Sequence, residues 1–137
     1  MDHRRRFSTF VPGGHDPHSA ILEAIEFALD FLPQSSLGER SRIKAAIIVE
    51  ELVSNVLRHG ADGKDISLWL ALEDQAGALA LMIEDDGKPF DPTNTESFTG
   101  PDPLTGGGIG IAIVDAWGED FSYSRRDERN VLRVTVR

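Results

Sequence analysis

A carboxylate and an amide stand four residues apart in the segment Glu51-Leu-Val-Ser-Asn55, and Arg58 follows three residues later. On a helix this spacing places the three side chains on one face. A carboxylate so placed can act as a general base toward a hydroxyl or water, and an amide oxygen is a suitable ligand for Mg²⁺. Arg58 could contact a phosphate from the same face. The alternative is a solvated polar stripe, because exposed helix faces usually carry charges.

A second candidate is the acidic turn that begins at Asp85 and continues through Asp86, Gly87, Lys88 and Pro89. Asp85 closes an apolar run typical of a strand, and Gly87 permits backbone torsions that other residues avoid. A carboxylate at such a strand end can accept a hydrogen bond from the exocyclic amine of adenine. An ordinary surface turn is the alternative, since Asp, Gly and Pro are common turn residues.

The third candidate is a glycine-rich loop that leads into a predicted helix. Backbone N–H groups approach an anion closely at glycines, and a helix N-terminus adds positive partial charge, so phosphates bind well there. The loop matches neither a dinucleotide-binding fingerprint nor a P-loop, which needs Gly-Lys-Ser/Thr. A loop without a ligand is the alternative. The residues concerned are Gly106, Gly107, Gly108, Ile109 and Gly110.

Helices and strands must position these three segments. A helix is predicted over about 38–59, closed by Gly60, with an apolar face opposite Glu51 and Asn55. That apolar face consists of Ala45, Val49, Leu52, Val53 and Val56. Before this helix, the alternation and turn residues predict a strand over 5–11 and a helix from about 16 to 33. After it they predict a hairpin with strands 66–73 and 78–84 and a helix over 109–117. Two last strands, over 121–124 and 131–136, are joined by a charged link.

Composition excludes several classes of function. The net charge of −9, from 23 acidic and 14 basic residues, argues against nucleic-acid binding. The absence of cysteine excludes a thiol nucleophile and a disulfide scaffold, and the four histidines lack the spacing of a zinc site. No apolar run reaches the ~18 residues of a membrane span. We therefore expect one cytoplasmic domain over residues 1–137, with Trp69 and Trp117 in its core.

Taken in order, the three segments resemble the N, G1 and G2 boxes of the GHKL ATPase superfamily, which includes gyrase and the histidine kinases. Within it the chain resembles the bacterial anti-sigma-factor serine-protein kinases, through Glu51 to Asn55, Arg58-His59-Gly60, Asp85 to Pro92, and a short lid before Gly106. The order and spacing of the boxes are more specific than any one box. The resemblance extends from about residue 7 to residue 136.

The resemblance implies an α+β two-layer sandwich, the Bergerat-type ATP-binding fold, with helices on one face of a mixed, mostly antiparallel sheet. Glu51 would be the general base, and Asn55 the Mg²⁺ ligand. Asp85 would bind the adenine amine, with Gly87 shaping the turn beneath it. An ATP lid would span about residues 91–108. The implied ATP-binding residues are Asn55, Arg58, Asp85, Gly87, Gly106, Gly107, Gly108, Ile109 and Gly110.

Two positions depart from the family pattern. Pro89 stands where the G1 box has its second glycine, a variant that this branch tolerates. The Gly-Thr pair often found in the last strands is replaced near Asn130 and Val131, where Thr135 is the only nearby hydroxyl.

The resemblance implies a protein serine/threonine kinase that uses ATP and Mg²⁺. Such a kinase acts as an anti-sigma factor or partner-switching regulator, phosphorylates a STAS-type anti-anti-sigma protein, and commonly forms a homodimer. A non-catalytic module is the alternative, in which nucleotide only orders the lid while the domain captures a sigma factor or another regulator. A detached histidine-kinase domain fits the short lid less well.

Overall fold

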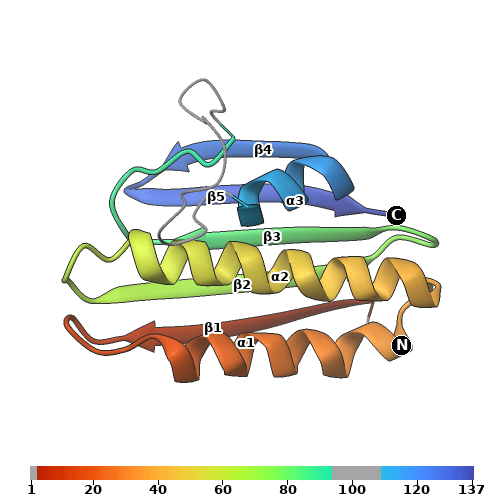
Figure 1. Ribbon diagram of the computed structural model, residues 1–137, viewed down its shortest axis with the longest axis horizontal. Coiled ribbons are helices and arrows are strands. Elements are labelled where there is room, and N and C mark those ends of the chain that lie inside the picture. Colours follow the sequence, from red (N-terminus) through yellow and green to blue (C-terminus); the bar gives the residue numbers. More distant parts are fainter. Residues whose placement is uncertain (1–2, 94–108) are drawn as a thin grey trace.

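The computed structural model describes residues 3–93 and 109–137, in which five strands form one sheet and the α-helices cover one of its faces (Figure 1). The strand order is β1-β2-β3-β5-β4. In chain order the elements are β1 (Arg4–Val11), α1 (His18–Phe31), the 3₁₀ turn η1 (Leu32–Gln34), α2 (Glu39–His59), β2 (Ile66–Asp74), β3 (Leu79–Asp85), α3 (Ile109–Trp117), β4 (Glu119–Arg126) and β5 (Arg129–Val136).

The predicted two-layer α+β sandwich is confirmed, but its sheet is not mixed. Every strand pair in the described part of the chain is antiparallel. The two hairpins, β2–β3 and β4–β5, impose this direction on their own strands, and β5 returns alongside β3. The N-terminal strand β1 also runs antiparallel to its neighbour β2.

The β4–β5 hairpin is longer than the sequence pattern predicts. Its strands continue into the charged segment that was expected to be a link, and only Asp127 and Glu128 form the turn. Both have positive φ angles, 48° and 64°, which suit the two-residue turns that match strand twist. The extended register places Asn130 directly opposite Asp85 on β3. The candidate site therefore includes a residue from the other end of the chain.

The helix α2 lies where it was predicted, between Gly38 and Gly60. The apolar face expected from its sequence is buried against the sheet, since Leu52 and Val53 are fully buried and Val56 nearly so. Burying such side chains contributes about 1.5–3 kcal/mol each, which fixes the rotation of the helix about its axis. That rotation leaves Glu51 and Asn55 on the side away from the core. None of the helices in the described ranges combines the length and apolarity needed to cross a membrane.

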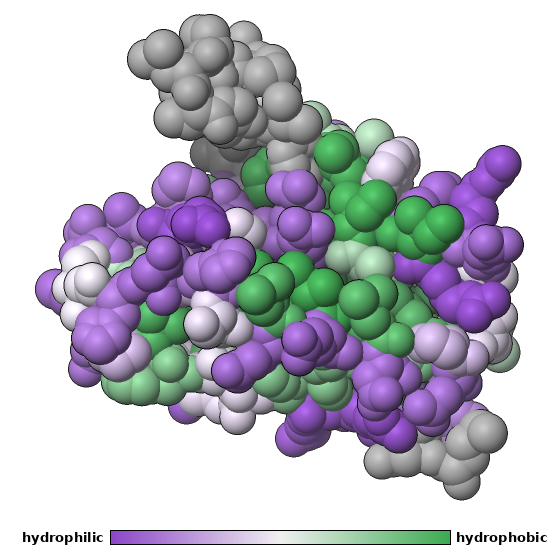
Figure 2. All heavy atoms as spheres, turned by 60° about the horizontal axis from the view of Figure 1, so that its bottom comes forward, coloured by the Kyte–Doolittle hydropathy of each residue, from purple (hydrophilic) through white to green (hydrophobic). Residues whose placement is uncertain are grey.

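The expectation that both tryptophans are core residues is wrong. Trp117, at the end of α3, is 37% exposed, and Trp69 lies half-buried on the sheet. Hydrophobic residues also gather on the side of the molecule shown in Figure 2. The large hydrophobic side chains that the described structure leaves exposed are Phe10, Leu22, Leu29, Ile43 and Trp117.

Candidate functional site

Asp85 ends β3 and is one of two buried polar side chains in the described structure, with 2% of its surface exposed. Its Oδ1 atom accepts two hydrogen bonds, from the Gly87 amide at 2.9 Å and from Asn130 Nδ2 at 3.0 Å. Among the described residues, no hydrogen bond reaches its Oδ2 atom. One carboxylate oxygen is thus fixed by the protein, while the other can accept a hydrogen bond from a ligand amine.

Burial raises the pKa of the Asp85 carboxyl above its ordinary value of 3.8. The nearby charge of Asp86 acts in the same direction. The hydrogen bonds from Asn130 and Gly87, and the charge of Arg125, lower the pKa and offset part of this rise. The hydrogen bond from Asn130 therefore helps to keep the carboxylate ionised in a site that water reaches poorly.

Asn130 was not among the predicted site residues, yet its side chain connects the site to the last hairpin. Its Nδ2 atom donates to Asp85 Oδ1 and, at 2.8 Å, to the Lys88 carbonyl oxygen. Its Oδ1 atom accepts from the Tyr123 hydroxyl at 2.6 Å and from the Arg125 guanidinium at 3.0 Å. All four hydrogen-bonding positions of the amide are used, so its orientation is fixed. The only feature of the sequence that pointed to Asn130 was its position where the chain lacks the family's usual Gly-Thr pair.

The turn after Asp85 packs against the C-terminal end of α2, and this contact requires glycine at position 87. A Cβ atom on Gly87 would lie 2.6 Å from the Gly60 carbonyl oxygen and 2.9 Å from both Asp85 Oδ1 and Ile66 Cδ1. The Lys88 amide donates to the same Gly60 oxygen at 3.0 Å. The turn therefore joins the end of α2 to the end of β3.

Replacing Gly87 by Ala should lower the free energy of unfolding by about 1–3 kcal/mol, because two of the atoms that would clash are backbone or site atoms with little room to move. Chemical denaturation measures this change. The matched control is Gly38→Ala, where an added Cβ meets nothing within 4 Å and the cost at this helix N-cap should stay below about 1 kcal/mol. Equal effects of the two substitutions would contradict the packing argument.

The three predicted residues of α2 lie along one side of the helix. Glu51 is half-buried, and desolvation, followed by the charge of Glu50, raises its pKa above 4.5. The Nδ2 atom of Asn55 is buried and has no hydrogen-bond partner in the part of the chain that the structure describes. Arg58 is exposed and donates from Nε to the Ser54 hydroxyl at 3.1 Å.

The glycine-rich segment is described only in part. The helix α3 begins at Ile109, with Gly110 in its first turn, as predicted. The predicted residues Gly106, Gly107 and Gly108 lie outside the described residues, as does the predicted lid beyond Thr93. Where the lid begins, the Asp91 carboxylate accepts hydrogen bonds from the amide and hydroxyl of Thr93, at 2.9 and 2.5 Å.

The described residues fit a nucleotide and its metal ion at two points. Asp85 offers a carboxylate oxygen that has no partner among the described residues, as recognition of an amino-purine requires. A buried donor without a partner is costly, so the Asn55 Nδ2 atom, which has none among the described residues, indicates a position where an acceptor atom of a ligand, such as a phosphate oxygen, lies. An Asn oxygen is a hard ligand of the kind Mg²⁺ uses together with phosphate oxygens and water.

Comparison with known proteins agrees with this geometry. Residues 16–136 match the family described as histidine kinase-like ATPase domain. A similar solved structure is that of the Acinetobacter baumannii histidine kinase AdeS, with 20% sequence identity and a TM-score of 0.52, covering 96% of this chain and 68% of that one. At this identity the likeness shows the fold. The comparison with curated protein sequences gives no match. The family match spans most of the chain, which therefore belongs to the histidine kinase-like ATPase domain family.

Proposed function

We propose that this domain binds Mg-ATP and transfers the γ-phosphoryl group to a serine or threonine hydroxyl of a protein partner. The observation that carries the proposal is the Asp85 carboxylate, whose Oδ1 is held by Asn130 and Gly87 and whose Oδ2 has no partner in residues 3–93 and 109–137. Membership of the family implies ATP binding. The resemblance to anti-sigma-factor kinases supports a STAS-type anti-anti-sigma protein as the substrate and a homodimer as the working form.

In this proposal each site residue has one task. Asp85 accepts a hydrogen bond from the adenine amine, and the Asn55 amide oxygen holds the metal ion beside the phosphates. Bound Mg²⁺ would supply charge neutralisation, which is the main requirement of phosphoryl transfer. Arg58, exposed at the end of α2, can approach the phosphates from the helix. By the resemblance, Gly106 to Gly110 would wrap the phosphates.

Glu51 lies one helical turn before Asn55, so its carboxylate is placed beside the proposed metal position. Glu51 accepts the proton of the acceptor hydroxyl as the new O–P bond forms and the bond from the γ-phosphorus to ADP breaks. Desolvation raises the pKa of this carboxyl, which makes it a stronger base than an exposed glutamate. Transfer should consequently decline as the pH falls through that raised pKa.

Glu51→Gln should reduce phosphoryl transfer by about 10²–10⁴-fold while leaving the Kd for Mg-ATP within a few-fold of the wild type, because it removes the base but keeps the side-chain shape. Transfer is measured with radiolabelled ATP and a STAS-domain protein, and binding by calorimetry. Glu50→Gln is the matched control, since Glu50 is the exposed neighbour on the same helix. Full transfer by Glu51→Gln would remove the general-base role.

A protein acceptor is supported by the exposed apolar side chains of the helix layer. Ile43 of α2 is 56% exposed and, together with Trp117 of α3, lines a shallow depression of about 490 Å³. Apolar surface of this kind is typical of protein contacts. If ATP binds but no STAS-domain protein is phosphorylated, the non-catalytic ATP-gated binding module becomes the better account.

A further inference from the structure

The face of the sheet opposite the helices, here called the open face, carries the side chains that alternate with the core residues. On β1, β2, β3 and β5 these include Arg6, Trp69, Met82 and Arg133, which share one face by the strand register. No helix of the described ranges covers this face (Figure 1). It lies across the sheet from α2 and is separate from the candidate ATP site.

Two adjacent depressions mark the open face. The first has a volume of about 350 Å³ and extends from Arg6 on β1 to Arg129 on β5. The second, of about 480 Å³, continues toward β4, and both are lined by Ala71 and Met82. Apolar side chains therefore form a continuous floor beneath both depressions, with arginines around it.

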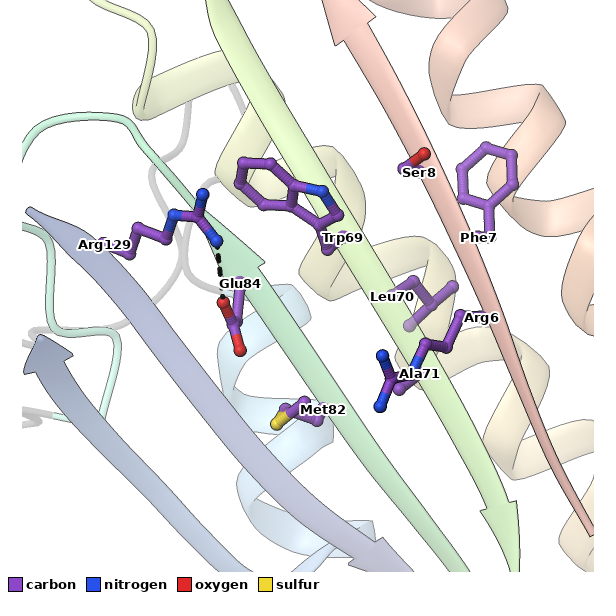
Figure 3. A pocket seen from close by; sticks show the side chains of 9 residues that line it. All are labelled: Arg6, Phe7, Ser8, Trp69, Leu70, Ala71, Met82, Glu84 and Arg129. Carbon is purple, nitrogen blue, oxygen red and sulfur yellow. Dashed lines mark ion pairs between the residues drawn. The ribbon is translucent and has the colours of Figure 1, made fainter. Parts of the chain in front are cut away.

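Figure 3 shows how the arginines of the first depression lie. Arg129 reaches from β5 over the indole ring of Trp69, with its guanidinium carbon 4.1 Å from the ring centroid, and pairs with Glu84 at 3.5 Å. Arg6 extends from β1 toward Ala71 on the other side of the depression. Two guanidinium groups thus border one apolar floor, and a single carboxylate neutralises one of them.

The charge of this face differs in sign from that of the whole chain. The two depressions are lined by four arginines and three carboxylates, whereas the chain carries a net charge of −9. In the part of the chain that the structure describes, no ion pair joins Arg6 or Arg133 to a carboxylate. The negative charge is therefore concentrated elsewhere, and this face attracts anionic groups over a short range.

From this arrangement we infer that the open face binds a segment of a partner protein rich in both carboxylates and apolar side chains. The carboxylates would pair with Arg6 and Arg133, which can each form bidentate contacts. The apolar side chains would cover Ala71 and Met82. Arg129, already stacked on Trp69, provides an anchor of the kind found at interface hot spots, where Trp and Arg are enriched.

A protein segment fits this face better than a nucleic acid. Phosphates along a polynucleotide would meet the carboxylates Glu73, Glu84 and Asp120, which line the same depressions. Bases need free aromatic faces for stacking, and the ring of Trp69 already carries Arg129. The net charge of −9 also repels a long polyanion more strongly than a short acidic segment.

The test is a fluorescence-anisotropy titration with a labelled peptide of alternating glutamate and leucine. We expect saturable binding that the double variant Arg6→Gln/Arg133→Gln weakens by about tenfold or more. Arg5→Gln changes the neighbour of Arg6 on β1, which lies on the helix side of the sheet and pairs with Asp30, and should leave binding within about twofold of the wild type. In a Trp117→Phe background Trp69 is the sole tryptophan, and its emission should change as the bound peptide excludes water from around the stacked pair of Trp69 and Arg129.

Each contrary result overturns the inference. No binding by the wild type, or equal loss in Arg5→Gln and the double variant, removes the open face as the site. Equal binding of a lysine-leucine peptide shows apolar adhesion only. Tighter binding of an oligouridylate than of the acidic peptide assigns the face to nucleic acid. The readout does not involve ATP, so it is independent of the proposed kinase activity.

Discussion

Asp85→Asn is expected to weaken Mg-ATP binding by about 10- to 100-fold and to leave the domain folded. The substitution replaces a charged acceptor by an amide, and hydrogen bonds to charged groups contribute about 1.5–3 kcal/mol. If the Asn Oδ1 atom keeps the contacts with Gly87 and Asn130, its Nδ2 donor faces the adenine amine, which is also a donor. The mismatch leaves two donors opposed in a poorly hydrated site.

The same substitution should change the pH dependence of stability in a defined direction. The folded-state pKa of Asp85 is raised, chiefly by burial, so the carboxyl favours folding when protonated. That contribution is fully present below the unfolded-state pKa and is lost as the pH rises through the folded-state pKa. Asp85→Asn removes this loss. The variant should therefore gain stability relative to the wild type at neutral pH, and the difference should shrink in acid.

Calorimetry gives the Kd for Mg-ATP, and urea denaturation at several pH values gives the free energy of unfolding. Asp86→Asn is the matched control, because Asp86 is the exposed neighbour. Its Oδ1 atom accepts a hydrogen bond from the Ser67 amide, which an Asn side chain can also accept. If the wild type binds Mg-ATP and Asp85→Asn binds it with the same Kd, Oδ2 does not face the nucleotide. Loss of affinity in both variants would indicate a general charge effect.

The parts of this molecule that follow from local pattern were predictable. A long amphipathic repeat between Gly38 and Gly60 predicts the helix α2. The packing of its apolar face then determines where Glu51 and Asn55 lie. The β2–β3 hairpin follows from alternation on both sides of a turn, so the position of Asp85 at a strand end was also predictable. In each case a few neighbouring residues decide the local structure.

The parts that depend on register between distant strands were not predictable. Asn130 lies in a charged stretch that resembles a link, because the residues around it (Arg125 to Arg129) lack the apolar alternation of a strand. Pairing along β5 overrides this weak local preference and carries Asn130 into contact with Asp85, 45 residues away in the sequence. The wholly antiparallel sheet and the exposure of Trp117 depend in the same way on tertiary packing.

Asn130→Ala is expected to weaken Mg-ATP binding by about tenfold and to lower the free energy of unfolding by about 1–3 kcal/mol, because buried partners lose their hydrogen bonds. The groups that lose Asn130 as a partner are Asp85 Oδ1, the Lys88 carbonyl oxygen, the Tyr123 hydroxyl and the Arg125 guanidinium. A loss of affinity could follow from this structural damage alone. The pH profile separates the two effects. The hydrogen bond from Asn130 lowers the pKa of Asp85, so its removal should raise that pKa further.

The variant should therefore lose ATP binding at a higher pH than the wild type as the solution is acidified. Carbon-detected NMR titration of the Asp85 carboxyl measures the same shift without nucleotide, so it holds even if the domain proves not to bind ATP. Tyr123→Phe is the control, because it removes a hydrogen bond to Asn130 but leaves the contact between Asn130 and Asp85 in place. Asn130→Thr, which keeps a side-chain donor at this position, should recover part of the affinity. If Asn130→Ala leaves the Asp85 titration unchanged, Asn130 braces the hairpin and does not tune the carboxylate.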